Sequence, residues 1–154
     1  WYTPEDIIAA AHETMGGIDL DPASSDEANE IVKASNYYTK DDDGLAQQWR
    51  GRVWMNPPYA ASLVGKFCDK VVDHYLADDI AAAVVLVNNG TETRWGQLLL
   101  ENCEAVCFPS RRVRFWSPRG KSAAPLQGQM LCYFGPDAPA FRDTFQRLGI
   151  VLHG

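Results

Sequence analysis

Residues 52–59 read RVWMNPPY, and this segment sets where a central strand must stop. The apolar run Val-Trp-Met favours a buried strand, whereas Pro57 and Pro58 can neither donate a ladder hydrogen bond nor continue the strand. The strand is therefore expected to end at Asn56. In open α/β sheets ligands bind beyond the carboxyl ends of the strands, so this amide and the residues after it would form a rigid lip over that space. An amide held beside the ring of Tyr59 suits a flat heterocycle.

The pattern on both sides of this segment predicts helices alternating with strands. Thr3 is expected to cap a first helix that has Pro4 at its first position and that ends at glycines 16–17. Residues 18–22 alternate as a short strand does, which would place Asp19 and Asp21 on the same side. Further helices are expected from 24 or 25 to 34, after residue 59 through 75, at 92–102 and at 138–148, and further strands at 36–39, 80–87, 105–108, 113–116, 130–134 and 150–152.

The fold class follows from this order of elements. Residues 80–87 form a near-continuous apolar run, which is typical of a strand covered on both faces. Helices and strands alternate early and β-type runs follow, so the sequence predicts an α/β fold, with a mixed or mostly parallel central sheet and helices on both faces. The length of 154 residues fits one domain spanning 1–154. The chain begins at Trp1, so we expect a few leading residues to precede it in the natural protein.

Composition narrows the class of protein. No apolar run approaches the roughly 20 residues of a membrane helix and no secretory signal opens the chain, so we expect a cytoplasmic protein with no membrane partner. The sequence contains no C-x-x-C pair and no H-E-x-x-H pattern, which argues against a metal site. Its cysteines, which we expect to be reduced and mostly buried, are Cys68, Cys103, Cys107 and Cys132. The sequence leaves the oligomeric state open.

Charge is distributed unevenly along the chain. The formal net charge is -6, but residues 1–43 hold 11 acidic and 2 basic side chains, whereas residues 44–154 hold 9 acidic and 12 basic ones. Five of the 14 basic residues fall in one window of eleven residues, namely Arg111, Arg112, Arg114, Arg119 and Lys121. Such a local patch matters more than the isoelectric point for contact with phosphates, so the second part of the chain could face a polyanion.

Asn56 and the residues after it offer a way to activate an exocyclic amine on an aromatic base. Such an amine is a poor nucleophile because its lone pair is delocalised into the ring. The side-chain oxygen of Asn56 and the backbone carbonyl of Pro57, both aimed at the amine hydrogens, would draw that lone pair back to the nitrogen. Tyr59 would stack on the base, which must leave the duplex to be reached. The less specific interpretation is a strand-ending double proline with an incidental tyrosine.

Five segments together resemble the phage-type DNA N6-adenine methyltransferases, which depend on S-adenosylmethionine. They are Trp1-Tyr2-Thr3-Pro4, Asp19-Leu20-Asp21-Pro22-Ala23, Gly44-Leu45 with Trp49, Asn56-Pro57-Pro58-Tyr59, and Arg111 to Phe115, in the expected order over about residues 1–134. The resemblance implies a Rossmann-like methyltransferase fold and transfer of a methyl group to the N6 amine of adenine in double-stranded DNA. The sequence leaves little room for a separate target-recognition domain, so none is expected. It implies catalysis by Asn56, Pro57, Pro58 and Tyr59, and a bacterial host cell as the location if a phage encodes the protein.

The resemblance also implies a set of residues for S-adenosylmethionine. Asp21 and Pro22 occupy the position of the first cofactor motif, where Asp21, helped by Asp19, would meet the cationic methionine end. The other residues implied on this cofactor are Tyr2, Thr3, Pro4, Ala23, Asp43, Gly44 and Leu45, although 43–45 also read as a plain acidic turn. Most such enzymes carry Gly-x-Gly after the acidic-Pro pair, whereas here Ala-Ser-Ser follows. The ribose hydroxyls could meet Asp26, Glu27 or Asn29, which are candidates by nearness only.

The window from Arg111 to Lys121 mixes cations with aromatic rings, as surfaces that bind nucleic acid do. It also fits an edge strand guarded by charge. Base readout would come from this window, from the loop after Val87 that contains Arg94 and Trp95, or from residues 59–62, and a short recognition site is expected.

Two other functions stay open at this point. The Asn-Pro-Pro-Tyr motif also serves methyltransferases that act on RNA bases or on protein glutamine side chains, because each substrate presents a planar amine or amide. The basic window favours nucleic acid over protein. A binding module that keeps the fold without turnover is the other alternative, and the missing Gly-x-Gly favours it.

Overall fold

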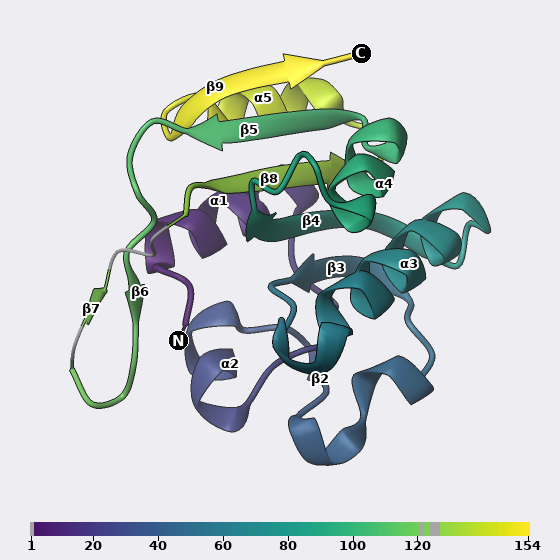
Figure 1. Cartoon of the computed structure of the whole chain (residues 1–154), viewed down its shortest axis with the longest axis vertical. Coiled ribbons are helices and arrows are strands. Elements are labelled where there is room, and N and C mark those ends of the chain that lie inside the picture. The colour runs from purple at the N-terminus through teal and green to yellow at the C-terminus, as the bar shows by residue number, and fades with distance from the viewer. Residues whose placement is uncertain (1, 121, 124–126) are drawn as a thin grey trace.

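A seven-stranded sheet runs through the computed structural model, which describes residues 2–120, 122–123 and 127–154 (Figure 1). The strands stand in the order β2 (Asn36–Tyr37), β1 (Leu20–Asp21), β3 (Gly51–Met55), β4 (Ile80–Asn88), β8 (Gln129–Phe134), β5 (Ala105–Pro109) and β9 (Gly149–His153). The first four are parallel to one another, and β8 and β9 are antiparallel to their neighbours, so five of the seven strands point the same way. The predicted α/β fold with a mostly parallel sheet is confirmed.

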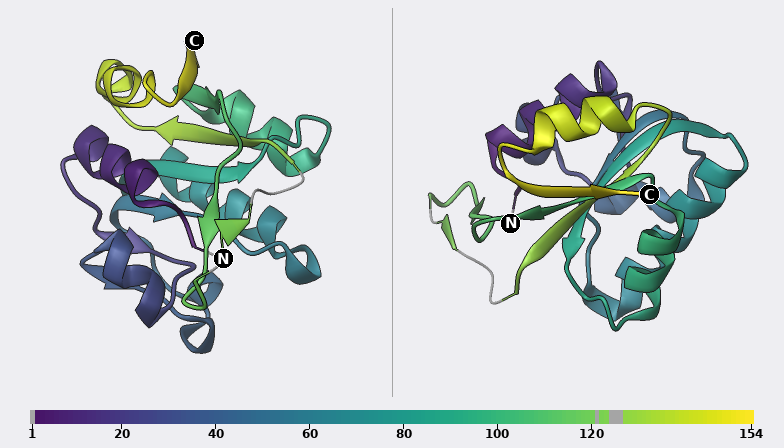
Figure 2. Two further views of the ribbon diagram at one scale, coloured as in Figure 1. Left: turned by 90° about the vertical axis from the view of Figure 1, so that its left-hand side faces the viewer. Right: turned by 90° about the horizontal axis from the view of Figure 1, so that it is seen from above.

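Helices cover both faces of this sheet (Figure 2). On one face, α1 (Glu5–Met15) and α5 (Ala138–Phe145) pack over Trp54, Val84 and Leu131. On the other, α3 (Leu63–Leu76) and α4 (Arg94–Asn102) pack over Val53 and Val85. Successive strand residues thus serve opposite faces, which is the period of two that a strand imposes. The short α2 (Asp26–Val32) adds Val32 to the first of these cores.

The central strands are deeply buried. Residues 82–87 of β4 are all buried, flanked in register by β3 on one side and β8 on the other. Burying one such valine or leucine side chain contributes about 1.5–3 kcal/mol, so the middle of the sheet is strongly stabilised. The edge at which β1, β3 and β4 end is therefore a rigid platform for whatever side chains stand there.

Two local predictions near the N-terminus are wrong. Helix α1 begins at Glu5 with Pro4 at the N-cap position, and Thr3 does not cap it, because its hydroxyl is engaged by another side chain. The first strand is only Leu20–Asp21 rather than residues 18–22. The carboxylate of Asp19 accepts a hydrogen bond from the backbone nitrogen of Arg52 at 2.8 Å, which takes a donor that the sheet ladder would otherwise use.

The segment predicted as a strand at 113–116 forms a separate small hairpin. Its strands are β6 (Phe115–Trp116) and the antiparallel β7 (Ser122–Ala123). Figure 1 shows the hairpin extending from the same edge of the sheet at which β3 and β4 end. Residue Tyr2 pairs with Trp116 in an isolated bridge, so the N-terminal segment is tied to the base of this hairpin. Among the described residues, no helix is long and apolar enough to span a membrane.

Candidate functional site

A cavity of about 770 Å³ lies at the edge where the parallel strands end. Strands β1, β3 and β4 each end at it and antiparallel β8 begins there, so Asp21, Asn56, Asn88 and Gln129 all line it. This is the position at which open α/β sheets bind ligands, and the volume lies within the range of about 300–1,000 Å³ for small-molecule sites.

Asn56 stands directly after β3 and its side chain is held in one orientation. The amide nitrogen Nδ2 donates a hydrogen bond to Oγ1 of Thr3 at 3.3 Å, which leaves Oδ1 as the acceptor available to a ligand. Thr3 is only 6% exposed and Pro57 is also buried, whereas Pro58 is exposed. The lip predicted from the two prolines is present, and a threonine 53 positions earlier adds a constraint that no local pattern indicates.

The threonine is itself fixed by Trp116 at the base of the β6–β7 hairpin. The indole nitrogen of Trp116 donates to the backbone oxygen of Thr3 at 3.0 Å. The backbones of Tyr2 and Trp116 exchange two further hydrogen bonds of 2.7 and 3.0 Å, and their rings meet edge to face. Asn56 is thereby connected through Thr3 to the segment that carries the basic window.

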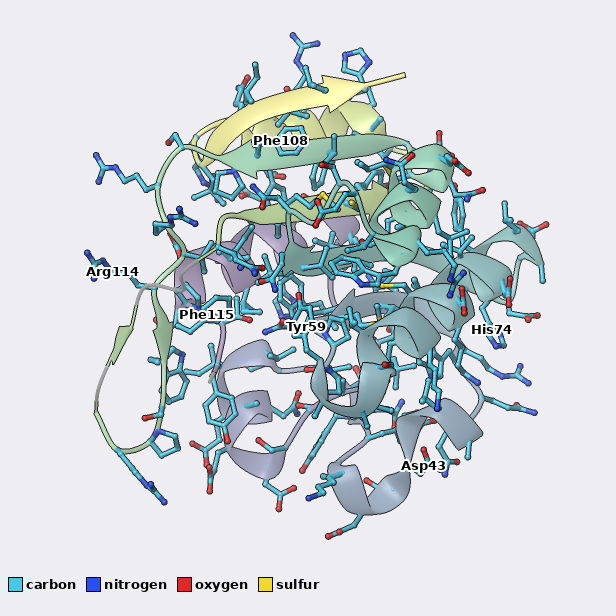
Figure 3. All side chains as sticks on the ribbon, in the orientation of Figure 1. Asp43, Tyr59, His74, Phe108, Arg114 and Phe115 are labelled. Carbon is cyan, nitrogen blue, oxygen red and sulfur yellow. The ribbon has the colours of Figure 1, made fainter. Side chains whose placement is uncertain are left out.

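Two aromatic rings stand at the cavity. Tyr59 is 39% exposed, but its hydroxyl oxygen accepts a hydrogen bond from the backbone nitrogen of Asn88 at 2.7 Å. Loss of solvent around this hydroxyl raises the pKa of Tyr59 to about 12, so the phenol stays neutral. Its ring meets the edge of Trp95, and Phe115 lines the same cavity. Figure 3 shows Tyr59 near the centre of the view and Phe115 on the β6–β7 hairpin.

Asp21 is a buried carboxylate on the wall of the cavity. It is 3% exposed, and no lysine, arginine or histidine in the described part of the chain forms an ion pair with it. Desolvation raises the pKa of Asp21 from 3.8 to about 7, against the opposing effect of hydrogen bonds from the Ala23 backbone and the Ser24 side chain. A buried carboxylate without a countercharge is a favourable place for the cationic group of a ligand.

Asp19, predicted beside Asp21, lies elsewhere. Its two oxygens accept hydrogen bonds of 2.8 and 3.0 Å from the guanidinium of Arg52, which holds the pKa of Asp19 below its usual range. Neither Asp19 nor Pro4 lines the cavity, whereas the remaining residues expected on the cofactor do, namely Tyr2, Thr3, Asp21, Pro22, Ala23, Asp43, Gly44 and Leu45. The three ribose candidates Asp26, Glu27 and Asn29 are outside the lining too.

Gly44 fixes the far wall of the cavity. A Cβ atom at this position would lie 2.1 Å from the backbone oxygen of Pro22, so only glycine allows the two segments to approach so closely. The buried indole of Trp49 donates a hydrogen bond to the Gly44 oxygen at 2.9 Å. The preceding residue, Asp43, has a left-handed backbone with φ 54°. The loop from 43 to 45 is therefore held against Pro22 at the wall of the cavity.

The residues expected on DNA divide into three groups. Arg111, Arg112, Arg114 and Arg119 are exposed, and within the described residues none of them forms an ion pair. Figure 3 shows Arg114 pointing outwards beside Phe115. Arg94 is paired with Asp69 at 2.9 Å and does not line the cavity. Lys121 lies outside the described residues.

Asn88 and Gln129 are site residues that the sequence did not single out. Asn88 ends an apolar strand as Asn56 does, which is a signal that could have been used. Gln129 directly precedes the apolar run 130–134, but nothing local indicates that it lies beside Asn88. No group of three or more potential metal ligands occurs among the described residues.

Comparison with known proteins gives one family. The model of the family described as DNA N-6-adenine-methyltransferase (Dam) matches residues 1–140. A protein of Escherichia phage T1 named DNA N-6-adenine-methyltransferase is 36% identical over 62 residues, which are 39% of this chain and 25% of that protein. A Thermoplasma acidophilum protein of known crystal structure is 14% identical, with a TM-score of 0.39 over 72% of this chain and 60% of that one.

Proposed function

This chain belongs to the DNA N-6-adenine-methyltransferase (Dam) family, and from that premise we propose that it transfers the methyl group of S-adenosylmethionine to the N6 amine of adenine in double-stranded DNA. The observation that carries the proposal is a juxtaposition at one sheet edge. The amide of Asn56 lies between the buried carboxylate of Asp21, which forms no ion pair among the described residues, and the exposed aromatic ring of Tyr59, and all three line one cavity.

The cavity fits the cofactor on its Asp21 side. The carboxylate of Asp21 would pair with the ammonium group of the methionine moiety, which would offset the desolvation that raises the pKa of Asp21 to about 7. Residues 43–45 and Pro22, held together by the close approach at Gly44, would enclose the adenosine part. When bound, S-adenosylmethionine supplies an electrophilic methyl group.

Asn56 and Pro57 would prepare the amine for attack. Because Thr3 accepts from Nδ2 of Asn56, the oxygen Oδ1 is free to accept one hydrogen of the adenine amine. The backbone carbonyl of Pro57 would accept the other hydrogen, and the lone pair would then be concentrated on the nitrogen. Tyr59 would stack on the base once it has left the duplex, with its hydroxyl held by the Asn88 backbone. The neutral phenol adds no charge to this step.

The exposed arginines favour DNA over protein as the substrate. Arg111, Arg112, Arg114 and Arg119 belong to the segment that leads into and through the β6–β7 hairpin, and Trp116 in this segment is bonded to Thr3. Cations on this side of the cavity would contact phosphates next to the base that enters it.

A methyl-transfer assay tests the proposal. Labelled S-adenosylmethionine is incubated with the protein and with double-stranded DNA, RNA or a glutamine-containing protein, and labelled N6-methyladenine in DNA is the expected product. Asn56→Ala should lose transfer by at least about 100-fold while calorimetry shows nearly unchanged cofactor affinity, since the amide acts on the amine. Asn36→Ala, an exposed asparagine on β2, is the matched control. Full activity of Asn56→Ala would contradict the mechanism, and label in RNA or protein alone would reassign the substrate.

A further inference from the structure

Asn88 and Gln129 form an amide pair at the cavity that has not been given a role. They are opposite each other in the antiparallel register of β4 and β8. The amide nitrogen Nε2 of Gln129 donates to Oδ1 of Asn88 at 2.7 Å, and Gln129 is only 7% exposed. Asn88 is half-buried, and both residues line the cavity. None of the buried side-chain polar atoms among the described residues lacks a hydrogen-bond partner, so the remaining groups of the pair are accessible from the cavity and can bond to a ligand there.

The position of the pair in the sheet puts it on the base side of the cavity. The strand order β1, β3, β4, β8 sets Asp21, Asn56, Asn88 and Gln129 in a row along one edge. Neighbouring strands lie about 4.8 Å apart, so the pair begins one strand beyond Asn56, on the side away from Asp21. The Tyr59 ring is fixed to the same place, because its hydroxyl accepts from the Asn88 backbone.

The hydrogen-bonding capacity left over by the pair has a definite pattern. A carboxamide offers two N–H donors and one acceptor oxygen. With Gln129 donating one N–H to Asn88, the groups left over are both N–H groups of Asn88, the second N–H of Gln129 and the oxygen Oε1 of Gln129. If both amides were turned over, the groups left over would be both N–H groups of Gln129, the second N–H of Asn88 and the oxygen Oδ1 of Asn88. In either arrangement each of the two residues keeps at least one N–H donor.

We propose that the Asn88–Gln129 pair selects against guanine and thymine by donating a hydrogen bond to the ring nitrogen next to the amine that Asn56 holds. In adenine this nitrogen, N1, is an acceptor, whereas the corresponding ring nitrogens of guanine and thymine carry a hydrogen and would face the donor unfavourably. Cytosine presents the same amine and acceptor as adenine, so this contact does not discriminate against it. The inference rests on the proposed function and assigns a base contact in the same cavity. Asn56 thus recognises the amine, and the amide pair recognises its neighbour on the Watson–Crick edge.

The test compares base analogues in a duplex whose sequence is taken from sites that the wild-type protein methylates. In 1-deazaadenine the acceptor N1 is replaced by C–H, whereas 7-deazaadenine keeps the Watson–Crick edge and serves as the matched control. Single-turnover transfer by the wild-type protein should have kcat/KM about 10- to 100-fold lower on 1-deazaadenine than on adenine, which is the range for one base-edge contact. On 7-deazaadenine it should change by less than about threefold.

A variant isolates the pair. Gln129→Met keeps the length of the side chain but removes its polar groups, so kcat/KM on adenine should fall by about tenfold and substitution with 1-deazaadenine should then cost little more. Equal wild-type rates on adenine and 1-deazaadenine would overturn the inference while leaving the methyltransferase function intact. The inference would also fail if folded Gln129→Met lost as much kcat/KM on 1-deazaadenine as the wild type does. Failure to find any DNA site that the wild-type protein methylates would instead refute the proposed function. The analogue comparison on the wild-type protein decides the matter even if the variant does not fold.

Discussion

Replacing Asp21 with asparagine should stabilise the cofactor-free protein and at the same time weaken its affinity for S-adenosylmethionine. The carboxylate is buried against the cavity wall with no cation paired to it in the described part of the chain, so its charge is unfavourable when the site holds no ligand. Asparagine has nearly the same shape and keeps an oxygen that can accept the hydrogen bond from the Ala23 backbone.

The magnitude follows from the change in proton affinity on folding. Desolvation raises the pKa of Asp21 from 3.8 to about 7 in the folded protein, so the folded state holds a proton that the unfolded chain releases. The free energy of unfolding should therefore fall as pH rises through the window from 3.8 to about 7, and stay low above it. Each tenfold change in proton affinity is worth about 1.4 kcal/mol, which gives roughly 4 kcal/mol at alkaline pH. The Asp21→Asn variant should recover up to this amount at pH ~8.5 and lose this pH dependence.

Two measurements on the same preparations test this reasoning. Thermal unfolding at acid and alkaline pH should give a higher Tm for Asp21→Asn than for the wild type at alkaline pH. Calorimetric titration of the wild type should show a cofactor affinity that rises with pH up to about 7, because Asp21 ionises over this range. The Asp21→Asn variant should bind the cofactor weakly at every pH. Asp19→Asn is the control. The ion pair with Arg52 lowers the pKa of Asp19, so loss of this pair should destabilise the protein while the affinity for the cofactor stays the same. An Asp21→Asn variant no more stable than the wild type at alkaline pH, or one with unchanged cofactor affinity, would refute the reasoning.

Three further changes test other contacts of the site. Thr3→Val removes the acceptor that orients the Asn56 amide, so the single-turnover rate at saturating cofactor should fall several-fold, and Thr3→Ser should restore it. Gly44→Ala places a Cβ atom 2.1 Å from a backbone oxygen, which should cost about 1–3 kcal/mol in a denaturant titration. Arg111→Gln with Arg114→Gln should weaken DNA binding and reduce the slope of log K against log salt by about 2, and an unchanged slope would exclude these arginines from phosphate contact.

Strong local signals made the frame of the molecule predictable. The double proline at 57–58 ends β3 at Met55 and leaves Asn56 at the edge, because proline cannot extend a ladder. The continuous apolar run of β4 likewise indicates a strand buried on both faces, and the structure extends it only to Asn88. These features depend on residues next to one another in the chain, which is why the sequence alone was sufficient.

Contacts between distant residues decided what could not be predicted. Thr3 followed by Pro4 is a sound N-cap pattern, but a hydrogen bond to Asn56, which lies far along the chain, takes the hydroxyl instead. Alternation put Asp19 beside Asp21, whereas pairing with Arg52 draws Asp19 out of the cavity. Since the pairing of strands and of opposite charges is not local, a period of two indicates a face and leaves the partner undetermined.

The loop after Pro22 is held in place by a residue distant in the sequence. The Ala-Ser-Ser sequence after Pro22 lacks the glycines that most such enzymes use for close backbone approach. In this chain the close approach occurs across the cavity, where the absence of a side chain on Gly44 lets its backbone pack against the oxygen of Pro22. The Ala23 backbone is then held by its hydrogen bond to Asp21, at 3.2 Å, and both residues line the cavity. A loop without glycines can thus be held at the cavity by a glycine elsewhere in the chain, and calorimetric titration with S-adenosylmethionine tests whether this loop supports turnover or only a binding module.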